Sequence, residues 1–215
     1  FSTMVYASKS FSVASQETVP WSMFFKPDGT KMYVCGDQGD DVNEYDLGTA
    51  WEVNTATYLR AYSFGSRIYT PRGIFFKADG TEMYISAYYP TGYYWLNQYT
   101  LSTAWNVSTA TFTAEANVHG NTAALAGLSL SADGATLVVA SDSYDKVFEF
   151  ALSTPWLVSS ATLVTSASIS SQDATPTGLF FDPDGGQMFL IGSNTDKVYS
   201  YETSLPYTLT VPASV

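Results

Sequence analysis

The sequence predicts an all-β protein folded as a four-bladed β-propeller, and three observations lead to this prediction. First, an Asp-Gly turn between two β-type runs recurs four times in the 215 residues, at Asp28, Asp79, Asp133 and Asp184. Second, an aromatic residue follows each turn at a similar interval, at Trp51, Trp105, Trp156 and Tyr207. Third, no window shows a sustained apolar period of about 3.6 residues, so we expect almost no helix.

The first turn, Pro27-Asp28-Gly29, has a composition that explains its shape. Proline presets φ for the first corner, aspartate suits the second, and glycine accepts a left-handed conformation without steric cost. Such a turn closes a tight β-hairpin. Ala78 and Ala132 replace the proline in the second and third repeats, so the Asp-Gly pair is the constant part of the turn.

Each full repeat is predicted to contain four strands, because Val, Ile, Tyr, Phe and Thr gather in short runs between Gly, Asn, Asp, Ser and Pro. The first strands precede the turn, at 22–25, 73–76, 127–131 and 178–181. The second strands follow it, at 31–36, 82–87, 136–141 and 187–192. The third strands are expected at 42–47, 96–101, 147–152 and 198–203. The fourth strands come after a polar connection, at 56–64, 110–118 and 161–169.

The two ends of the chain favour a closed ring of blades. Four repeats of roughly 51 residues with four antiparallel strands each are typical of a propeller. Residues 4–13 align with the fourth strands, and the last repeat stops near Val215, where its own fourth strand would begin. We therefore expect the N-terminal strand to complete the last blade and remove an exposed edge. Residues 1–215 would then form a single domain.

The repeat resembles known propeller repeats. The run Phe-Phe-Lys-Pro-Asp-Gly-Thr-Lys-Met-Tyr-Val at 24–34 is similar to the strand–Asp-Gly–strand signature of YVTN-type bacterial repeats, and Val-x-x-Tyr-Asp-Leu at 42–47 to their next strand. The longer unit, which includes 152–156 and 171–181, resembles repeats in marine bacterial and phage surface proteins. The period is longer here than in YVTN repeats. The resemblance covers nearly the whole chain, and it implies the fold but no activity.

Composition restricts the classes of partner. Twenty acidic against nine basic residues give a formal net charge of −11. This disfavours nucleic acid, which needs clustered Lys and Arg, and it disfavours an anionic membrane surface. No apolar run approaches the roughly 18 residues of a membrane span. The single Cys35 rules out an intrachain disulfide, and its repeat equivalents predict a small core position.

The chain starts at Phe1 rather than Met. We therefore expect a mature form, a trimmed chain or part of a longer protein.

An aromatic loop is the main candidate for binding. The second repeat holds the only insertion, and five aromatics fall within its eight-residue loop: Tyr88, Tyr89, Tyr93, Tyr94 and Trp95. In a propeller this loop is expected on the face around the channel mouth, by analogy with the fold. The rings would offer a stacking surface for a sugar or an anchor for a protein. The alternative is that they pack on the neighbouring blade or on another copy of the protein.

Polar residues related by the period are expected on the same rim. They are Gln16, Arg67, Asn121 and Gln172, with His119 in the same set of loops. Four further positions stand next in the period and are candidates to face the channel: Trp21, Arg72, Ala126 and Thr177. The plainer interpretation is that the rim positions are solvated loop residues.

The sequence predicts no catalytic residues, no metal and no cofactor. His119 is the only histidine, which excludes a centre built on several histidines, and no Gly-x-Ser-x-Gly motif is present. Three acids at the rim occupy equivalent positions before the third strands, and four more lie on the same face: Asp40, Asp145 and Asp196, then Asp37, Asp41, Asp142 and Asp173. No Asp-x-Asp-x-Asp-Gly pattern of a calcium loop is present, so we predict that these side chains cap turns. Paired carboxylates for glycoside cleavage stay open, because their separation cannot be read from sequence.

Three functions follow, in order of preference. The first is a non-enzymatic recognition module that is extracellular, on a cell surface or on a virion, and that binds a glycan or a protein through the channel-mouth face. The second is a structural module in which the same aromatics mediate homo-oligomerisation or attachment to a longer chain. The third is a hydrolase or lyase that uses carboxylates at the mouth.

Overall fold

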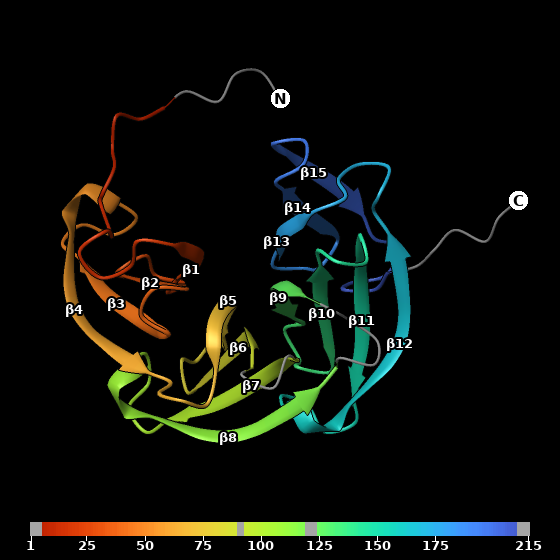
Figure 1. Cartoon of the computed structure of the whole chain (residues 1–215), viewed down its shortest axis with the longest axis horizontal. Coiled ribbons are helices and arrows are strands. Elements are labelled where there is room, and N and C mark those ends of the chain that lie inside the picture. The colour runs from red at the N-terminus through yellow and green to blue at the C-terminus, as the bar shows by residue number, and fades with distance from the viewer. Residues whose placement is uncertain (1–5, 90–92, 119–123, 210–215) are drawn as a thin grey trace, which may run out of the picture.

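The computed structural model describes residues 6–89, 93–118 and 124–209, and it shows a four-bladed β-propeller (Figure 1). Blade 1 consists of β1 (Pro20–Phe25), β2 (Lys31–Gly36), β3 (Asp41–Leu47) and β4 (Ala56–Ser63). Blade 2 consists of β5 (Tyr69–Phe76), β6 (Glu82–Tyr88), β7 (Tyr94–Leu101) and β8 (Ala110–Asn117). Blade 3 consists of β9 (Leu125–Leu130), β10 (Thr136–Ser141), β11 (Lys146–Leu152) and β12 (Ala161–Ser168). Blade 4 consists of β13 (Pro176–Phe181), β14 (Gln187–Gly192) and β15 (Lys197–Glu202).

The prediction of an all-β, four-bladed propeller is confirmed. Every blade is an antiparallel meander, with β1, β5, β9 and β13 nearest the centre and β4, β8 and β12 outside (Figure 1). The helical part of the described chain is three short 3-10 turns, η1 (Val53–Thr55), η2 (Val107–Thr109) and η3 (Val158–Ser160). Accordingly, none of the helices in the described ranges has the length and apolar character needed to cross a membrane.

The recurring Asp-Gly turn and the recurring aromatic are parts of one local structure. Gly80 has a φ of +72°, and its carbonyl accepts a hydrogen bond of 2.9 Å from the N–H of Trp105. The indole lies so close over the glycine that a Cβ there would come within 2.3 Å of the ring. Gly134 has the same relation to Trp156. Only glycine combines this conformation with this approach, which explains why the pair recurs.

Three apolar cores lie at the junctions between successive blades. We call the face of a blade that meets the next blade its trailing face, and the opposite one its leading face. At the first junction, Tyr33, Cys35 and Val42 of blade 1 pack against Ile74, Phe76, Met83 and Ile85 of blade 2. Cys35 is fully buried, which confirms its predicted core position. The other two junctions use the equivalent residues.

Buried hydrogen bonds also join the blades. The hydroxyl of Tyr33 donates to the carbonyl of Trp105 at 2.7 Å, and that of Tyr84 donates to the carbonyl of Trp156 at 2.9 Å. The recurrence of Trp51, Trp105 and Trp156 predicts that they pack between blades. Trp105 does so, whereas Trp51 is 58% exposed because no described blade precedes blade 1.

A second hydrogen bond repeats at all three junctions. A side-chain oxygen on the third strand of one blade accepts from a backbone N–H of the next: Glu44 from Val107, Gln98 from Val158, and Glu149 from Leu209.

The predicted closure by the N-terminal strand is wrong within the described residues. Blade 4 has three strands, and residues 6–13 form none. Instead, Phe11 and Val13 pack on the leading face of blade 1, against Met32, Val34 and Tyr45. This face has no preceding blade to cover it, so burying those rings holds the segment there. The ring of blades is consequently open between blade 1 and blade 4 (Figure 1).

Candidate functional site

The structure divides the aromatic loop into two pairs of rings. The strands β6 and β7 place Tyr88 opposite Tyr94, with ring centroids 5.1 Å apart. Tyr89 and Trp95 form the other pair, with centroids 5.4 Å apart. Tyr93 is exposed. The predicted cluster of aromatics is therefore present, but its two pairs have different surroundings.

The pair of Tyr89 and Trp95 faces inward. Tyr89 packs against the core between blades 1 and 2, and its hydroxyl lies within hydrogen-bond distance of two acceptors, Asn97 Oδ1 at 2.6 Å and Glu115 Oε2 at 2.9 Å. Burial, reinforced by the Glu115 carboxylate, raises the pKa of Tyr89 to about 12. Arg67 binds the same Glu115 at 3.1 Å. Tyr89 and Arg67 thus both bind the carboxylate of Glu115 within the protein. These contacts favour the packing alternative over ligand binding for the two residues.

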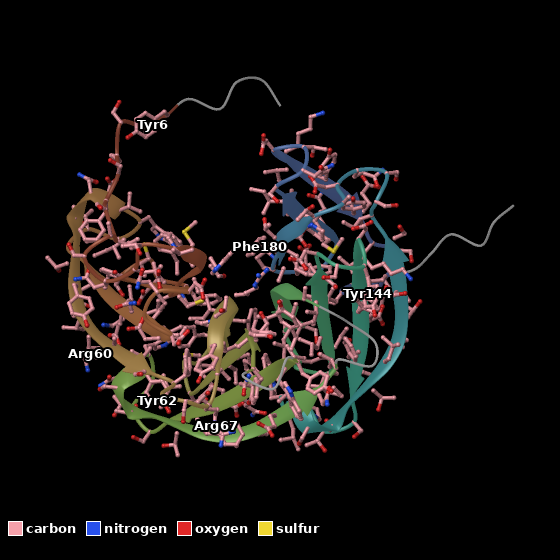
Figure 2. The ribbon with its side chains drawn as sticks, in the orientation of Figure 1. Tyr6, Arg60, Tyr62, Arg67, Tyr144 and Phe180 are labelled. Atoms are coloured by element: carbon pink, nitrogen blue, oxygen red, sulfur yellow. The ribbon has the colours of Figure 1, made fainter. Side chains whose placement is uncertain are left out.

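Arg67 has a second contact that fixes it. Its guanidinium carbon lies 3.6 Å from the centroid of the Phe112 ring, which is a close cation–π contact. Figure 2 shows Arg67 beside β8, at the outer side of the ring of blades rather than near its centre. Its predicted place on the channel rim is therefore not what the structure shows.

The pair of Tyr88 and Tyr94 lies beside an arginine on an inner strand. The guanidinium of Arg72 stacks over Trp21, with its carbon 4.6 Å from the ring centroid, and it lies 5.9 Å from the ring of Tyr94. Asp142 binds the same guanidinium at 3.0 Å. We call Trp21, Arg72, Tyr88, Tyr94 and Asp142 the aromatic–arginine cluster. It draws on blades 1, 2 and 3, which are far apart in sequence.

The polarity of the aromatic–arginine cluster is mixed. Trp21 keeps 37% of its surface exposed, so part of the residue meets solvent. Burial raises the pKa of Tyr94, so its hydroxyl stays protonated and can donate. The Nε of Arg72 is buried and has no partner among the described residues. The cluster thus offers an aromatic ring, hydrogen-bond donors and a carboxylate acceptor side by side.

The remaining predicted site residues do not join this cluster. Gln16 accepts from the Tyr45 hydroxyl at 3.5 Å, in the loop before β1. Gln172 accepts from Ser171 at 2.8 Å, and its backbone carbonyl accepts from Tyr199, in the loop before β13. Each of the two is tied into its own blade. His119 and Asn121 lie outside the described residues.

Three of the acidic residues at the rim, Asp37, Asp40 and Asp173, accept hydrogen bonds within the loops, as the turn-capping prediction expects. Asp37 accepts from the hydroxyl of Thr70 at 2.6 Å, and Asp40 accepts from its N–H at 2.9 Å. Asp173 accepts from the N–H groups of Thr175 and Thr195. In the part of the chain that the structure describes, no three His, Cys, Asp or Glu residues come together as a metal would need.

Sequence reasoning found part of this site. It singled out the insertion and noted that Trp21 and Arg72 are equivalent positions in the period. It assigned Asp142 only to the rim, because nothing in the sequence links residue 142 to residue 72. One signal in the sequence could have pointed to the site. The first-strand position that holds Trp21 in blade 1 and Arg72 in blade 2 holds the small Ala126 in blade 3.

Comparison with known proteins supports the fold. A protein from Lactobacillus plantarum superposes with a TM-score of 0.60 at 18% identity, over 86% of this chain and 51% of that one. The Cps50 (Swd1) β-propeller domain from Myceliophteria thermophila gives 0.53 at 10% identity, over 86% and 51%. A functionally unknown protein from Desulfotomaculum acetoxidans gives 0.54 at 12% identity, over 88% and 53%.

The chain spans about half the length of these solved structures. A scan against protein-family models gives no match, and neither does a search of curated proteins. At these identities the similarity shows the β-propeller fold alone.

Proposed function

We propose that this propeller is a non-enzymatic recognition module that binds a glycan, or a glycan-bearing surface, through the aromatic–arginine cluster. The single observation that carries the proposal is the stacking of Arg72 on Trp21 while Asp142 binds its guanidinium. This combination places a flat apolar surface next to a fixed donor and acceptor. A surface location, on a cell or a virion, is part of the proposal and is supported by the resemblance to surface-protein repeats.

The chemistry of the cluster suits a sugar ring. A pyranose has an apolar C–H face, which would stack on the exposed part of Trp21, and a rim of hydroxyl groups. Those hydroxyls would accept from Arg72 and donate to Asp142, and Tyr88 and Tyr94 would border them. Because Arg72 and Asp142 already hold each other, little side-chain freedom would be lost on binding.

A glycan array with three proteins tests the proposal. Wild type is expected to bind, and Trp21→Ala is expected to lose that binding, because truncating an aromatic anchor at an interface costs about 2 kcal/mol or more. Trp51→Ala is the matched control, since Trp51 is 58% exposed and lies at the Asp-Gly turn of blade 1 rather than in the cluster. Circular dichroism would check that both variants fold.

Two outcomes would contradict the proposal. No binding of wild type to any glycan would remove the glycan version, and equal binding by wild type and Trp21→Ala would move the site elsewhere. Tyr89→Phe is a useful further comparison, because Tyr89 sits in the inward-facing pair. It should change stability but leave glycan binding intact.

A further inference from the structure

The trailing face of blade 4 is uncovered. Val198 on β15 is 64% exposed, whereas its equivalents Val42, Leu96 and Val147 are buried at the three junctions. Ile191 on β14 is also exposed, and its equivalents Cys35, Ser86 and Ala140 are all buried. Phe180 projects from β13 toward the opening of the ring in Figure 2. Blade 4 therefore presents the same kind of surface that blades 1 to 3 bury, but nothing among the described residues covers it.

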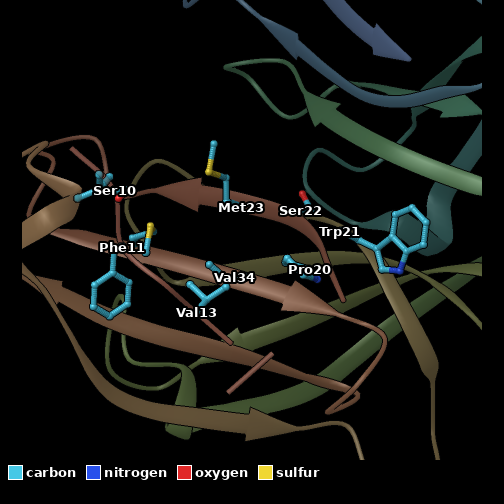
Figure 3. Close-up of a pocket in the computed structure, with 10 residues that line it drawn as sticks. Ser10, Phe11, Val13, Pro20, Trp21, Ser22, Met23 and Val34 are labelled. Atoms are coloured by element: carbon cyan, nitrogen blue, oxygen red, sulfur yellow. The ribbon is translucent and has the colours of Figure 1, made fainter. Parts of the chain in front are cut away.

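The leading face of blade 1 is the complementary surface. Met23 on β1 is 64% exposed, whereas its equivalents Ile74 and Leu128 are each 5% exposed. A pocket of about 460 Å³ opens beside it (Figure 3), and its lining includes Phe11, Val13, Met23, Met32, Val34 and Val53. At the internal junctions the side chains of a preceding blade cover the corresponding surface. The two ends of the open ring are thus the two halves of one junction.

The N-terminal segment already makes half of the contacts of a fourth strand. Phe11 meets Tyr45 edge to face at 5.6 Å, and its repeat equivalent Tyr62 meets Tyr99 edge to face at the same distance. Tyr62 also pairs with Val42 on the third strand of its own blade. Within the described residues, Phe11 has no such strand beside it and β15 pairs with no fourth strand. Each half of this blade is present in the molecule, but at opposite ends.

We propose that a second copy of this chain docks head to tail on the open junction. Its leading face covers Ile191 and Val198, and its residues 6–13 add to the edge of β15 as the fourth strand of blade 4. The register follows from blade 1, where Val42 pairs with Tyr62 and Glu44 pairs with Arg60. By the period, Val198 therefore lies opposite Phe11 of the second copy, and Ser200 lies opposite its Lys9.

The occupant is a second copy rather than the chain's own N-terminus for a structural reason. Phe11 and Val13 are packed on blade 1, and the amino group of Lys9 binds Glu52 at 2.6 Å. The segment therefore moves with blade 1, which lies across the opening from β15 (Figure 1). A second molecule brings its own segment and its own leading face together. Such a contact joins two different surfaces, so it is heterologous, and it builds a ring or a short chain of copies.

One feature of the internal junctions is missing from this one. Glu44, Gln98 and Glu149 accept hydrogen bonds from the next blade, but the equivalent residue of blade 4 is Ser200. The corresponding donor on the leading face is the N–H of Val53, which a serine side chain is too short to reach in the same way. We therefore expect the contact between copies to be reversible and dependent on protein concentration.

Sedimentation velocity over a range of concentrations tests the proposal with the 215-residue chain. Wild type is expected to shift from monomer toward dimer and larger species as concentration rises. Val198→Asp and Met23→Asp each place a charge on one of the two faces, and each variant alone is expected to stay monomeric because every junction it could form has one damaged face. Val164→Asp is the matched control, because Val164 is exposed on the outer strand β12. It should behave as wild type.

Mixing the two variants gives a sharper result. Val198→Asp keeps an intact leading face and Met23→Asp keeps an intact trailing face, so an equal mixture has one undamaged junction. The mixture is expected to form a dimer, while each variant alone is monomeric. All three substitutions change exposed side chains, so each monomer should keep the melting temperature of wild type. A wild type that remains monomeric at every concentration would overturn the proposal.

A disulfide distinguishes the second copy from the chain's own N-terminus. Residues opposite each other on antiparallel strands have Cα atoms about 4.5–5.5 Å apart, which suits a disulfide. Phe11→Cys with Val198→Cys in one chain is expected to give linked dimers and larger linked species on a non-reducing gel. A linked monomer would show that the ring closes within one chain, and the proposal would then be wrong. Cys35 is buried and does not compete.

Discussion

Removal of the Glu44 carboxylate should weaken the junction between blades 1 and 2 far more than removal of its exposed neighbour. Glu44 is fully buried, accepts from the N–H of Val107 at 3.1 Å, and binds the amino group of Lys31 at 2.7 Å. Asp46 binds the same amino group at 2.6 Å but is about half exposed. The two carboxylates therefore share one lysine in different surroundings.

The magnitude follows from what each change leaves behind. Glu44→Ala strands a buried N–H without an acceptor, which costs about 1–3 kcal/mol, and it removes one of two carboxylates from Lys31. We expect a total loss of about 2–4 kcal/mol in the free energy of unfolding. Asp46→Asn breaks only a surface ion pair, which is worth about 0–1 kcal/mol. Glu44→Gln should fall between them, because Gln98 caps Val158 with a neutral amide in blade 2.

Thermal and urea unfolding followed by circular dichroism would measure these differences. For a domain of this size 1 kcal/mol corresponds to roughly 2–4 °C in melting temperature, so Glu44→Ala should melt clearly below Asp46→Asn. Equal stability of Glu44→Ala and Asp46→Asn would refute the reasoning, because it would show that the buried N–H of Val107 finds another acceptor.

Two further predictions concern the turns and the loops. Gly134→Ala should lower the free energy of unfolding by about 2–5 kcal/mol, since its φ of +72° is unfavourable for alanine and its Cβ would come within 2.3 Å of the Trp156 ring. Gly65→Ala, at a φ of +61° with open space around it, should lower it by only about 1–2 kcal/mol. Urea unfolding would measure both losses. Asp173→Asn should lower stability by about 1–3 kcal/mol at neutral pH. Burial alone would raise the pKa of Asp173, but the hydrogen bonds from Thr195, Thr175 and Asn194 outweigh it and hold the pKa below 3.8. The stability that Asp173 contributes is therefore present above pH 3.8 and is lost as the pH falls through the lower folded-state pKa, so the gap between wild type and Asp173→Asn should narrow in acid.

Most of the strands could be predicted from the sequence because each blade repeats the same Asp-Gly turn between runs of β-forming residues. The strands at 31–36, 136–141 and 187–192 have the bounds that the structure gives to β2, β10 and β14. These strands directly follow an Asp-Gly turn, which fixes where pairing starts. The bounds differ more at β5, which begins at Tyr69 rather than residue 73. There the pairing with β6 is interrupted by irregularities near Pro71, which hydrophobic pattern does not reveal.

The position of the N-terminal segment could not be predicted from the period alone. Tyr62 makes two contacts, one with the third strand of its own blade and one with a tyrosine on the next blade. Alignment of Phe11 with Tyr62 therefore predicts both kinds of contact for Phe11. The structure keeps only the second, the contact with Tyr45. Sequence periodicity treats the two contacts as equivalent, whereas in three dimensions they lie on opposite sides of the opening. The same limitation hid the ion pair of Arg72 with Asp142, which joins blade 2 to the loop after β10.

The hydrogen bonds from Glu44, Gln98 and Glu149 have a consequence for how such a chain can change length. Blades 1 to 3 each carry the acceptor on the third strand, and blades 2 to 4 each carry the donor just after the recurring aromatic, so the three internal junctions have the same two halves. Excision of a whole repeat between equivalent positions, for example from after Gln98 to Glu149, would bring the Gln98 acceptor opposite the N–H of Leu209 and keep this hydrogen bond at the new seam. Duplication of a repeat would keep it too. This hydrogen bond between blades is therefore one part of the junction that does not depend on which two repeats are neighbours.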